Sequence, residues 1–310
     1  MQFFLYNLIS DNMKETINYY YKVYPDKIYE INSGVYFYFN DFKYYFIEFT
    51  RTKEEINLLV KISNDLYNKH VLVNTFILTK DNNYFVELND KIMILLRVNS
   101  IESDTNTLKD LIYFNNLLII DDSTKTESWA SLWSKKVDIF ESEMNNLNND
   151  YLLVQESIDY YIGLTENAIS YFNLVNLKNV KLSLCHKRLN KYLYSGLINN
   201  PINFMFDYEV RDIAEYIKTK FFTSYIDFDE IESVLNELNR DNSILLFCRL
   251  MYPSYYFDEV KKIMEEDYNE KNLKFYIDKV DDFENLLFDI YEIINKKYNI
   301  PPISWLENKN

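Results

Sequence analysis

The segment Leu182-Ser183-Leu184-Cys185-His186-Lys187-Arg188-Leu189 is followed about twenty residues later by Phe206-Asp207-Tyr208-Glu209. Each segment contains a short apolar run, over residues 180–184 and 203–206, of the length typical of a buried strand. Asn199-Asn200-Pro201 lies between the runs and has the composition of a turn. The sequence therefore predicts a pair of short strands near residues 180–208, joined by a polar loop.

On both sides of this strand pair the sequence is typical of long amphipathic helices. Trp129, Leu132, Trp133, Val137 and Phe140 recur at steps of three and four residues, which places them on one helix face. The same spacing predicts helices over 128–147, 151–175, 210–222, 228–238, 243–251, 255–264 and 283–297. Residues 101–310 are therefore expected to form a mainly helical part with the strand pair inside it.

The first 100 residues are different, because short aromatic runs alternate with turn residues. Strands are expected over 27–31, 35–39, 43–49, 74–78, 84–88 and 92–98, and apolar residues in 2–20 have helical spacing. Asn32-Ser33-Gly34, Asn40-Asp41 and Asn89-Asp90 supply the turns. Thr52 is a candidate helix cap, followed by Glu54 and Glu55 in the first turn. This order predicts an antiparallel sheet with one inserted helix.

The strand pair resembles the catalytic region of aminoglycoside and choline phosphotransferases. Residues 182–189 are similar to the segment that reads His-Gly-Asp-Leu in that superfamily, and residues 206–209 to its metal-binding Ile-Asp-Phe-Asp segment. Arg211-Asp212-Ile213-Ala214 looks like the helix start that follows. The resemblance implies an α+β, protein-kinase-like fold of two lobes, with an N-lobe at 1–100 and a C-lobe at 101–310.

Three further motifs resemble the spore-coat-associated branch of these kinase-like proteins, the CotS and YutH group. They are Ser128-Trp129-Ala130-Ser131-Leu132-Trp133, Tyr252-Pro253-Ser254-Tyr255-Tyr256-Phe257-Asp258, and Pro301-Pro302-Ile303-Ser304-Trp305-Leu306-Glu307. The resemblance implies a role in sporulation, with a location in the mother-cell cytoplasm at the forming spore coat and with spore-coat components as partners.

Composition excludes several other classes of function. The net charge of -15 argues against binding to nucleic acid or to an anionic membrane, since both require clustered Lys and Arg. The sequence has no apolar run long enough for a membrane span and no signal peptide at its start, which favours the cytoplasm. Two cysteines, Cys185 and Cys248, and two histidines, His70 and His186, predict neither a disulfide framework nor a metal cluster.

Glycine is the most discriminating residue type. Average usage of about 7% would give roughly 22 glycines, and the chain has three: Gly34, Gly163 and Gly196. A glycine-rich loop that covers phosphates is therefore nearly excluded, because only Gly34 lies between the first strands.

The chemical positions implied by the resemblance are mostly replaced. Glu48 is taken as the equivalent of the strand lysine, and Lys43, at the start of that strand, requires a register shift to point inward. Arg188 stands at the position of the catalytic Asp, and a guanidinium stays protonated and accepts no proton. Leu193 replaces the metal-binding Asn, so Asp207 alone remains. No cofactor is expected on this basis, with Mg-ATP as the alternative.

Structural roles are the preferred interpretations of the residues that remain. His186 is expected to be buried and to brace its loop, Asp207 to pair with Arg188 or Arg211, and Cys185 to be a buried apolar residue. Asp212 and Asp227 are expected to cap helices, and Glu54 and Glu55 are favoured at a helix N-terminus more than as partners of a lysine.

Three hypotheses for function follow. The first is a catalytically inactive kinase-like protein, a pseudokinase, that acts as a scaffold for a protein partner. The second is a phosphotransferase or nucleotide-binding protein that uses Asp207 with Glu209 and Glu48. The third is a helical interaction module, with the aromatic run 252–257 and Trp305 as its surface.

Overall fold

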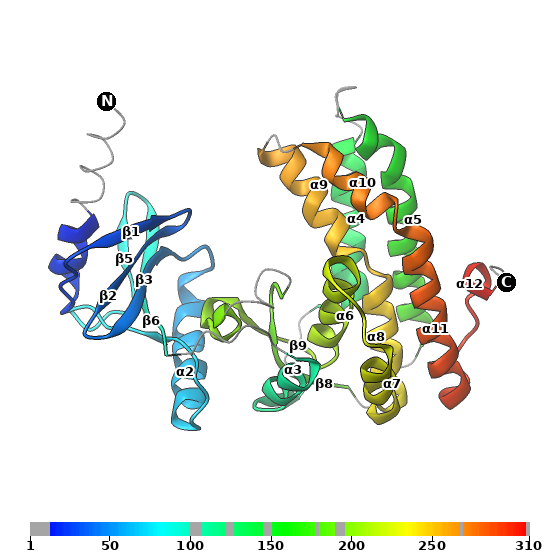
Figure 1. Cartoon of the computed structure of the whole chain (residues 1–310), viewed down its shortest axis with the longest axis horizontal. Helices are drawn as coiled ribbons and strands as arrows, with labels where there is room; N and C mark the ends of the chain where they lie inside the picture. The colour runs from blue at the N-terminus through cyan, green and yellow to red at the C-terminus, as the bar shows by residue number, and fades with distance from the viewer. Residues whose placement is uncertain are drawn as a thin grey trace. The chain divides into compact units, whose positions relative to one another are not determined.

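The computed structural model describes residues 13–99, 107–121, 127–144, 151–175, 177, 180–189, 196–266 and 269–307 (Figure 1). The chain divides into two compact units. The first unit consists of Met1–Asn106 and His186–Phe204, and the second consists of Thr107–Cys185 and Met205–Asn310. The loop between the two predicted strands thus belongs to the first unit, whereas the sequence assigns it to the helical part.

The first unit is built on an antiparallel sheet. Its strands are β1 (Ile28–Ile31), β2 (Gly34–Phe39), β3 (Phe42–Glu48), β4 (Thr75–Phe76), β5 (Val86–Leu88) and β6 (Lys91–Arg97). The order is β1-β2-β3-β6-β4, and β5 also pairs with β6. Helix α2 (Lys53–Asn68) is inserted between β3 and β4. The predicted antiparallel sheet with one inserted helix is confirmed.

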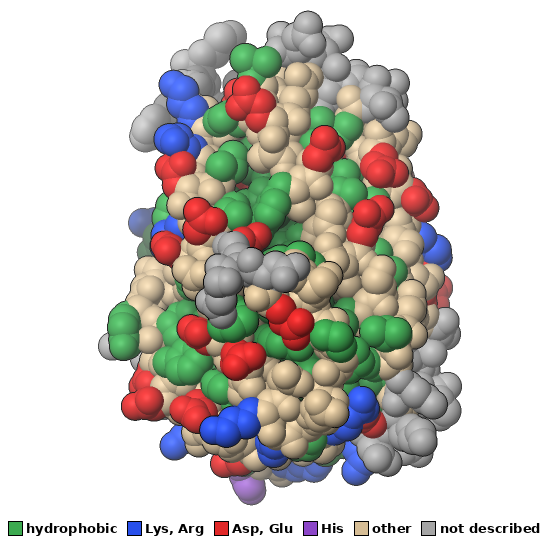
Figure 2. All heavy atoms as spheres, turned by 90° about the vertical axis from the view of Figure 1, so that its right-hand side faces the viewer, with side chains coloured by type: hydrophobic (Ala, Val, Ile, Leu, Met, Phe, Trp, Pro, Cys, Tyr) green, Lys and Arg blue, Asp and Glu red, His purple; other side chains and the backbone are tan. Residues whose placement is uncertain are grey.

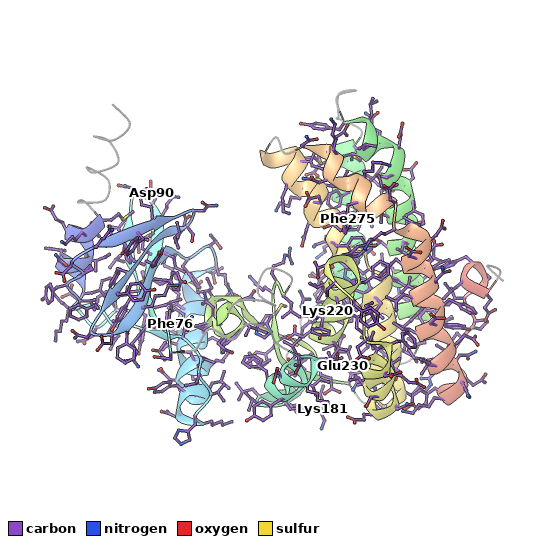
Figure 3. The ribbon with its side chains drawn as sticks, viewed as in Figure 1. Phe76, Asp90, Lys181, Lys220, Glu230 and Phe275 are labelled. Carbon is purple, nitrogen blue, oxygen red and sulfur yellow. The ribbon has the colours of Figure 1, made fainter. Side chains whose placement is uncertain are left out.

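Turn chemistry fixes the hairpins of this sheet. Asn40 and Asp41 join β2 to β3, and Asn89 and Asp90 join β5 to β6, all four with positive φ. Two successive residues with positive φ match the right-handed twist of the strands on either side, and Asn and Asp tolerate that conformation. Figure 3 labels Asp90 at its turn and Phe76 on β4.

The two faces of the sheet have different partners. Val35, Phe37, Tyr44, Phe46, Met93 and Leu95 share one face and pack with Ile17 and Tyr21, from the helical segment 13–20 and the residue after it. Ile47 and Ile94 are buried on the opposite face, as the period of two requires. The apolar side of α2, with Ile56, Leu59 and Leu66, contributes nothing to the first cluster and contacts β4, so α2 covers the second face.

The second unit is mainly helical (Figure 1). Its helices are α3 (Leu108–Asn115), α4 (Trp129–Met144), α5 (Leu152–Leu174), α6 (Arg211–Thr223), α7 (Phe228–Glu237), α8 (Arg240–Met251), α9 (Ser254–Glu266), α10 (Leu273–Ile277), α11 (Val280–Tyr298) and α12 (Ser304–Glu307). Helix α8 packs against α5, α6 and α11, and residues 241–251 are all buried. The core of this unit is therefore centred on α8.

The predicted strand pair lies in a small sheet of order β7-β8-β9, made of β7 (Ile119–Asp121), β8 (Lys181–His186) and β9 (Phe204–Tyr208). Two 3-10 turns, η2 (Gly196–Asn199) and η3 (Pro201–Asn203), precede β9. The pair was predicted, but β7 and α3 were not, because each is too short to give a periodic signal. Within the described ranges, no helix has the length and apolar character needed to cross a bilayer.

Candidate functional site

Asp207, the acidic residue expected at the metal-binding position, lies on β9 and is buried. Its Oδ2 atom accepts the indole N–H of Trp129 at 3.0 Å and the Nη1–H of Arg211 at 2.8 Å. Its Oδ1 atom accepts the backbone N–H of Tyr208 at 2.9 Å. The predicted ion pair of Asp207 is thus made with Arg211, and both carboxylate oxygens are engaged inside the second unit.

Trp129 is held in place by an aromatic stack. Its ring stacks on Trp133 at 5.5 Å between centroids, and Trp133 stacks on Tyr252 at 4.7 Å. The Arg249 guanidinium lies 5.4 Å from the Trp129 ring and 5.2 Å from the Tyr252 ring. The motifs at 128–133 and 252–258 therefore meet in the core, where they position the donor that binds Asp207.

A buried charge cluster, composed of Glu215, Lys218 and Arg249, lies on α6 and α8. The Glu215 carboxylate accepts Lys218 at 2.7 Å and Arg249 at 2.8 Å, and Ser254 donates to it at 3.0 Å. Lys218 also donates to the carbonyls of Arg249 and Tyr252. Three charges removed from water are tolerated because the polar atoms have partners.

Burial and charge act on the cluster in opposite directions. Burial alone would raise the pKa of Glu215, but Lys218 and Arg249 together hold that pKa well below its usual range. For Lys218, burial outweighs the attraction of Glu215 and lowers the pKa from 10.5 to about 8. Both pKa shifts are explained by burial and by the ion pairs within the protein, so they do not require a catalytic role for these residues.

The loop between β8 and β9 is held by side chains of the first unit. His186 is buried, as predicted, and its Nε2 atom lies 2.8 Å from the carbonyl oxygen of Ile198. Asn203 accepts the backbone N–H of Arg188 at 2.9 Å and donates to its carbonyl at 2.6 Å. The Arg188 side chain is exposed and donates to the Lys187 carbonyl. Leu193 lies outside the described residues.

Glu48, the expected equivalent of the strand lysine, has a basic partner on its own sheet. Glu48 pairs with Lys91 at 2.6 Å, on the sheet face shared by Phe46 and Met93. The strand lysine of active kinases pairs with a glutamate of the inserted helix, so it must lie on the face that α2 covers. That face carries Ile47 at this end of β3. Glu48 lies on the opposite face of β3, and its equivalence to the strand lysine stays a prediction.

Glu55 of α2 has a different basic partner. Arg51 donates to its Oε1 atom at 2.5 Å and to the carbonyls of Phe204 at 2.6 Å and Ile202 at 3.2 Å. The hydrogen bond from Arg51 is the main reason that the pKa of Glu55 lies below its usual range. Thr52 is the N-cap, as predicted, and its N–H donates to Glu55. Arg51 thereby ties α2 to the loop segment.

The turn between β1 and β2 is too short and too poor in glycine to form a loop that covers phosphates. Asn32 and Ser33 form a two-residue turn between β1 and β2. Gly34 has φ 151°, and an added Cβ would lie 2.2 Å from the carbonyl oxygen of Phe46. The missing side chain of Gly34 therefore makes room for the protein's own backbone and not for a phosphate.

These residues do not fit the magnesium and nucleotide that the kinase fold implies. Mg²⁺ is bound through carboxylate oxygens and substrate phosphates, whereas Asp207 already accepts a guanidinium and an indole N–H. A second cation beside Arg211 would be repelled. Among the described residues, no group of three or more His, Cys, Asp or Glu side chains is arranged to hold a metal ion.

Of the other local predictions, those for Asp227 and Cys185 are confirmed and the one for Asp212 is wrong. Asp227 caps α7, with Asp229 and Glu230 in the first turn, as expected. Asp212 is not a cap, because α6 begins after Val210 and Asp212 lies buried in its first turn. Cys185 is buried, and burial raises the pKa of its thiol well above the usual value, as suits an unreactive core residue.

Sequence reasoning missed Trp129, Lys218, Arg249 and Arg51 as partners. A signal existed for two of them. Lys218 follows Glu215 by three residues on a helix, the spacing of an ion pair. Trp129 lies in a motif singled out for its resemblance, although its contact with Asp207 spans 78 residues and gives no local pattern.

The sequence and the fold of this chain are similar to those of known proteins. Residues 14–289 match the family model described as spore coat putative kinase YutH. The endospore coat-associated protein YutH of Bacillus subtilis (strain 168) is 30% identical over 208 residues. That alignment covers 57% of this chain and 61% of the relative, less than two thirds of its length.

Solved structures share the fold at low identity. An aminoglycoside phosphotransferase from Alicyclobacillus acidocaldarius has a TM-score of 0.60 at 10% identity, covering 89% of this chain and 94% of its own. A spectinomycin phosphotransferase in complex with ADP and spectinomycin has a TM-score of 0.60 at 13% identity, covering 92% and 97%. The choline kinase LicA from Streptococcus pneumoniae has a TM-score of 0.51 at 13% identity, covering 89% and 99%. The aminoglycoside-phosphotransferase-like fold predicted from the sequence is confirmed.

Proposed function

The chain belongs to the spore coat putative kinase YutH family, and on this premise we propose that it is a pseudokinase that acts as a scaffold at the forming spore coat. The observation that carries the proposal is the engagement of Asp207 by Arg211 and Trp129. A kinase needs this carboxylate to hold a metal ion. Here it serves as the anion of a buried ion pair.

Two other positions support the absence of phosphoryl transfer. Arg188 stands where a base must accept the substrate proton, and arginine stays protonated in proteins. Gly34 begins β2 directly after the two-residue turn, tight against the backbone of Phe46. Each replacement removes a different part of the machinery, so no single compensating group repairs them all.

The proposed scaffold role is supported by the family to which the chain belongs. The relative's name associates it with the endospore coat, which suggests coat components as partners of this chain and the mother-cell cytoplasm as its location. A protein that has the kinase fold and does not transfer phosphate can still bind another protein through its surface. We therefore propose protein binding as its function.

A phosphotransferase with relocated groups is the second candidate. Burial raises the pKa of the Glu209 carboxyl, which also accepts a hydrogen bond from Asn242. A carboxyl with a raised pKa is a candidate acid or base. This candidate requires both Asp207 and Glu209 to be essential for turnover.

Turnover of Mg-ATP separates the two candidates. Purified wild type is incubated with radiolabelled Mg-ATP, water and a panel of aminoglycosides and choline, beside an active phosphotransferase of the same fold. The scaffold function predicts the same background signal for wild type, Asp207→Ala and Glu209→Gln. A wild-type rate above background that both variants abolish would establish the second candidate instead.

A further inference from the structure

A cavity of about 270 Å³ opens on the second unit, away from the degenerate catalytic region. It lies between the C-terminal end of α5, the last residue of α8 and the segment 302–305. Leu174, Met251, Ile303 and Trp305 supply apolar walls, and Asn167 and Ser170 supply polar edges. Leu174 is 66% exposed, a high value for a leucine. The cavity therefore presents apolar surface to solvent.

Trp305, one of the residues that line the cavity, has an unused donor. The Nε1 atom of Trp305 is buried and has no hydrogen-bond partner among the described residues. The segment that carries it is fixed on both sides, since Tyr171 donates to the Pro301 carbonyl at 3.1 Å and Tyr291 to Glu307 at 2.7 Å. A buried donor without a partner is destabilising, so an acceptor that reaches it would recover that free energy.

A strip of residues along one face of α5 leads to the cavity. Gly163, Asn167, Ser170 and Leu174 are spaced by four, three and four residues and therefore share one face of the helix. No atom of the described residues lies within 4 Å of a Cβ built on Gly163. Glycine inside a helix is less stable than alanine, and packing within the described residues gives no reason for it. A bare backbone at this point suits close approach by another molecule.

The surroundings of the cavity are acidic. The sequence of α5 contains Glu156, Asp159 and Glu166 and no Lys or Arg, and α12 ends at Glu307. Figure 2 shows the side of the molecule that carries α11 and α12, with many acidic side chains across it and exposed hydrophobic side chains between them. This charge favours a cationic partner.

We propose that this cavity and the α5 strip form a docking site for a cationic polypeptide segment. One apolar side chain of the segment enters the cavity, a backbone carbonyl accepts the Trp305 indole N–H, and basic side chains lie beside Glu166 and Glu307. The volume favours a single side chain, because sites that enclose a drug-sized ligand measure about 300–1,000 Å³. The inference rests on the proposed scaffold function and names its partner class.

The test uses three capped peptides with the full-length protein. The first carries arginines around a central leucine, the second replaces the leucine by serine, and the third replaces the arginines by glutamates. The readout is the indole N–H resonance of Trp305, assigned with Trp305→Phe, while the Trp129 indole, bonded to Asp207, serves as an internal reference. We expect a saturable shift of the Trp305 resonance with the first peptide alone.

Two variants change the site without touching the core. Gly163→Leu fills the strip where space is open, and Leu174→Ser removes an exposed wall. Each should weaken binding of the first peptide by about tenfold or more, which is about 1.4 kcal/mol. Ile139→Ser on α4, also an exposed apolar residue, is the matched control and should leave the affinity unchanged.

Several outcomes would overturn the inference. They are no shift with the first peptide at about 1 mM, equal shifts with the serine peptide, full affinity in both variants, or a wild-type dimer that Gly163→Leu dissociates. The last would identify a second copy of the chain as the occupant. None of them involves nucleotide, so failure here leaves the absence of phosphoryl transfer standing, and turnover of Mg-ATP would refute that absence without changing the peptide result.

Discussion

Trp129 donates its indole N–H to Oδ2 of Asp207 across 3.0 Å, from a helix that is 78 residues away in sequence. The same oxygen accepts Arg211 at 2.8 Å. The carboxylate expected at the metal-binding position is therefore part of the core of this protein, where it joins β9, α4 and α6.

Removing the cation of this pair should be costly. Arg211→Met leaves Asp207 buried and without its positive partner, which destabilises a fold by about 3–5 kcal/mol. Urea denaturation should show this loss in Arg211→Met, and much of it should be recovered in the double variant Asp207→Asn/Arg211→Met, in which no unpaired charge remains. A loss below about 0.5 kcal/mol in the single variant would mean that the pair does not hold the core.

Gly34 and Gly163 should respond to alanine in opposite directions. Gly34→Ala forces a Cβ to 2.2 Å from the Phe46 carbonyl oxygen at φ 151°, and strain of this kind costs about 1–3 kcal/mol. Gly163→Ala meets no described atom and gains helix propensity, so it should stabilise by about 0.5–1 kcal/mol. Thermal unfolding measures both. Stabilisation by Gly34→Ala would contradict the close approach of the backbones.

Replacing Arg51 should destabilise the segment 196–204 more than replacing the exposed Lys53 does. Arg51→Ala removes the donors to Glu55, Phe204 and Ile202, and charged hydrogen bonds in partly buried sites contribute about 1.5–3 kcal/mol. Hydrogen exchange of amides in 196–204 should accelerate in this variant. Lys53→Ala breaks the exposed pair with Glu87 and the contact with the Phe85 ring and serves as the control, with an expected loss below about 1 kcal/mol. Equal exchange rates in the two variants would rule out the tie.

Lys218 should give the protein a pH dependence at alkaline pH. Its pKa is lowered by burial from 10.5 to about 8 in the folded chain. Between these values the unfolded chain holds a proton that the folded chain has released, so stability rises with pH. The free energy of unfolding of wild type relative to Lys218→Met should therefore increase by about 2–3 kcal/mol from pH 8 to pH 10. A flat or falling difference would contradict the direction of the shift.

Much of the fold was predictable because its signals are local. The turns at Asn40-Asp41 and Asn89-Asp90, the Thr52 cap and the apolar spacing of α4 and α5 each depend on a few neighbouring residues. The strand predicted over 74–78 is shorter in the structure, where β4 comprises only Thr75–Phe76 because its pairing with β6 is limited to these two residues. Segments as short as α3 and β7 gave no such signal.

The candidate site was harder to predict, because its contacts are distant in sequence. The replaced residues Arg188 and Leu193 were visible as departures from a motif, and Asp207–Arg211 as a pair four residues apart. The Trp129 donor and the Arg249 cation come from other helices, so only packing brings them together. The aromatic run 252–257, offered as a surface, is mostly core, with Tyr252, Tyr256 and Phe257 buried.

The most direct test of the central claim is the melting temperature of the purified wild type with and without Mg-ATP. A ligand that binds only the folded state at about 100 times its Kd adds about 2.7 kcal/mol of stability, which is readily measured. The engagement of Asp207 by Arg211 and Trp129 predicts no shift at millimolar Mg-ATP, while an active phosphotransferase of the same fold shifts clearly. A saturable rise in the melting temperature that requires magnesium and is lost in Asp207→Ala would contradict the account.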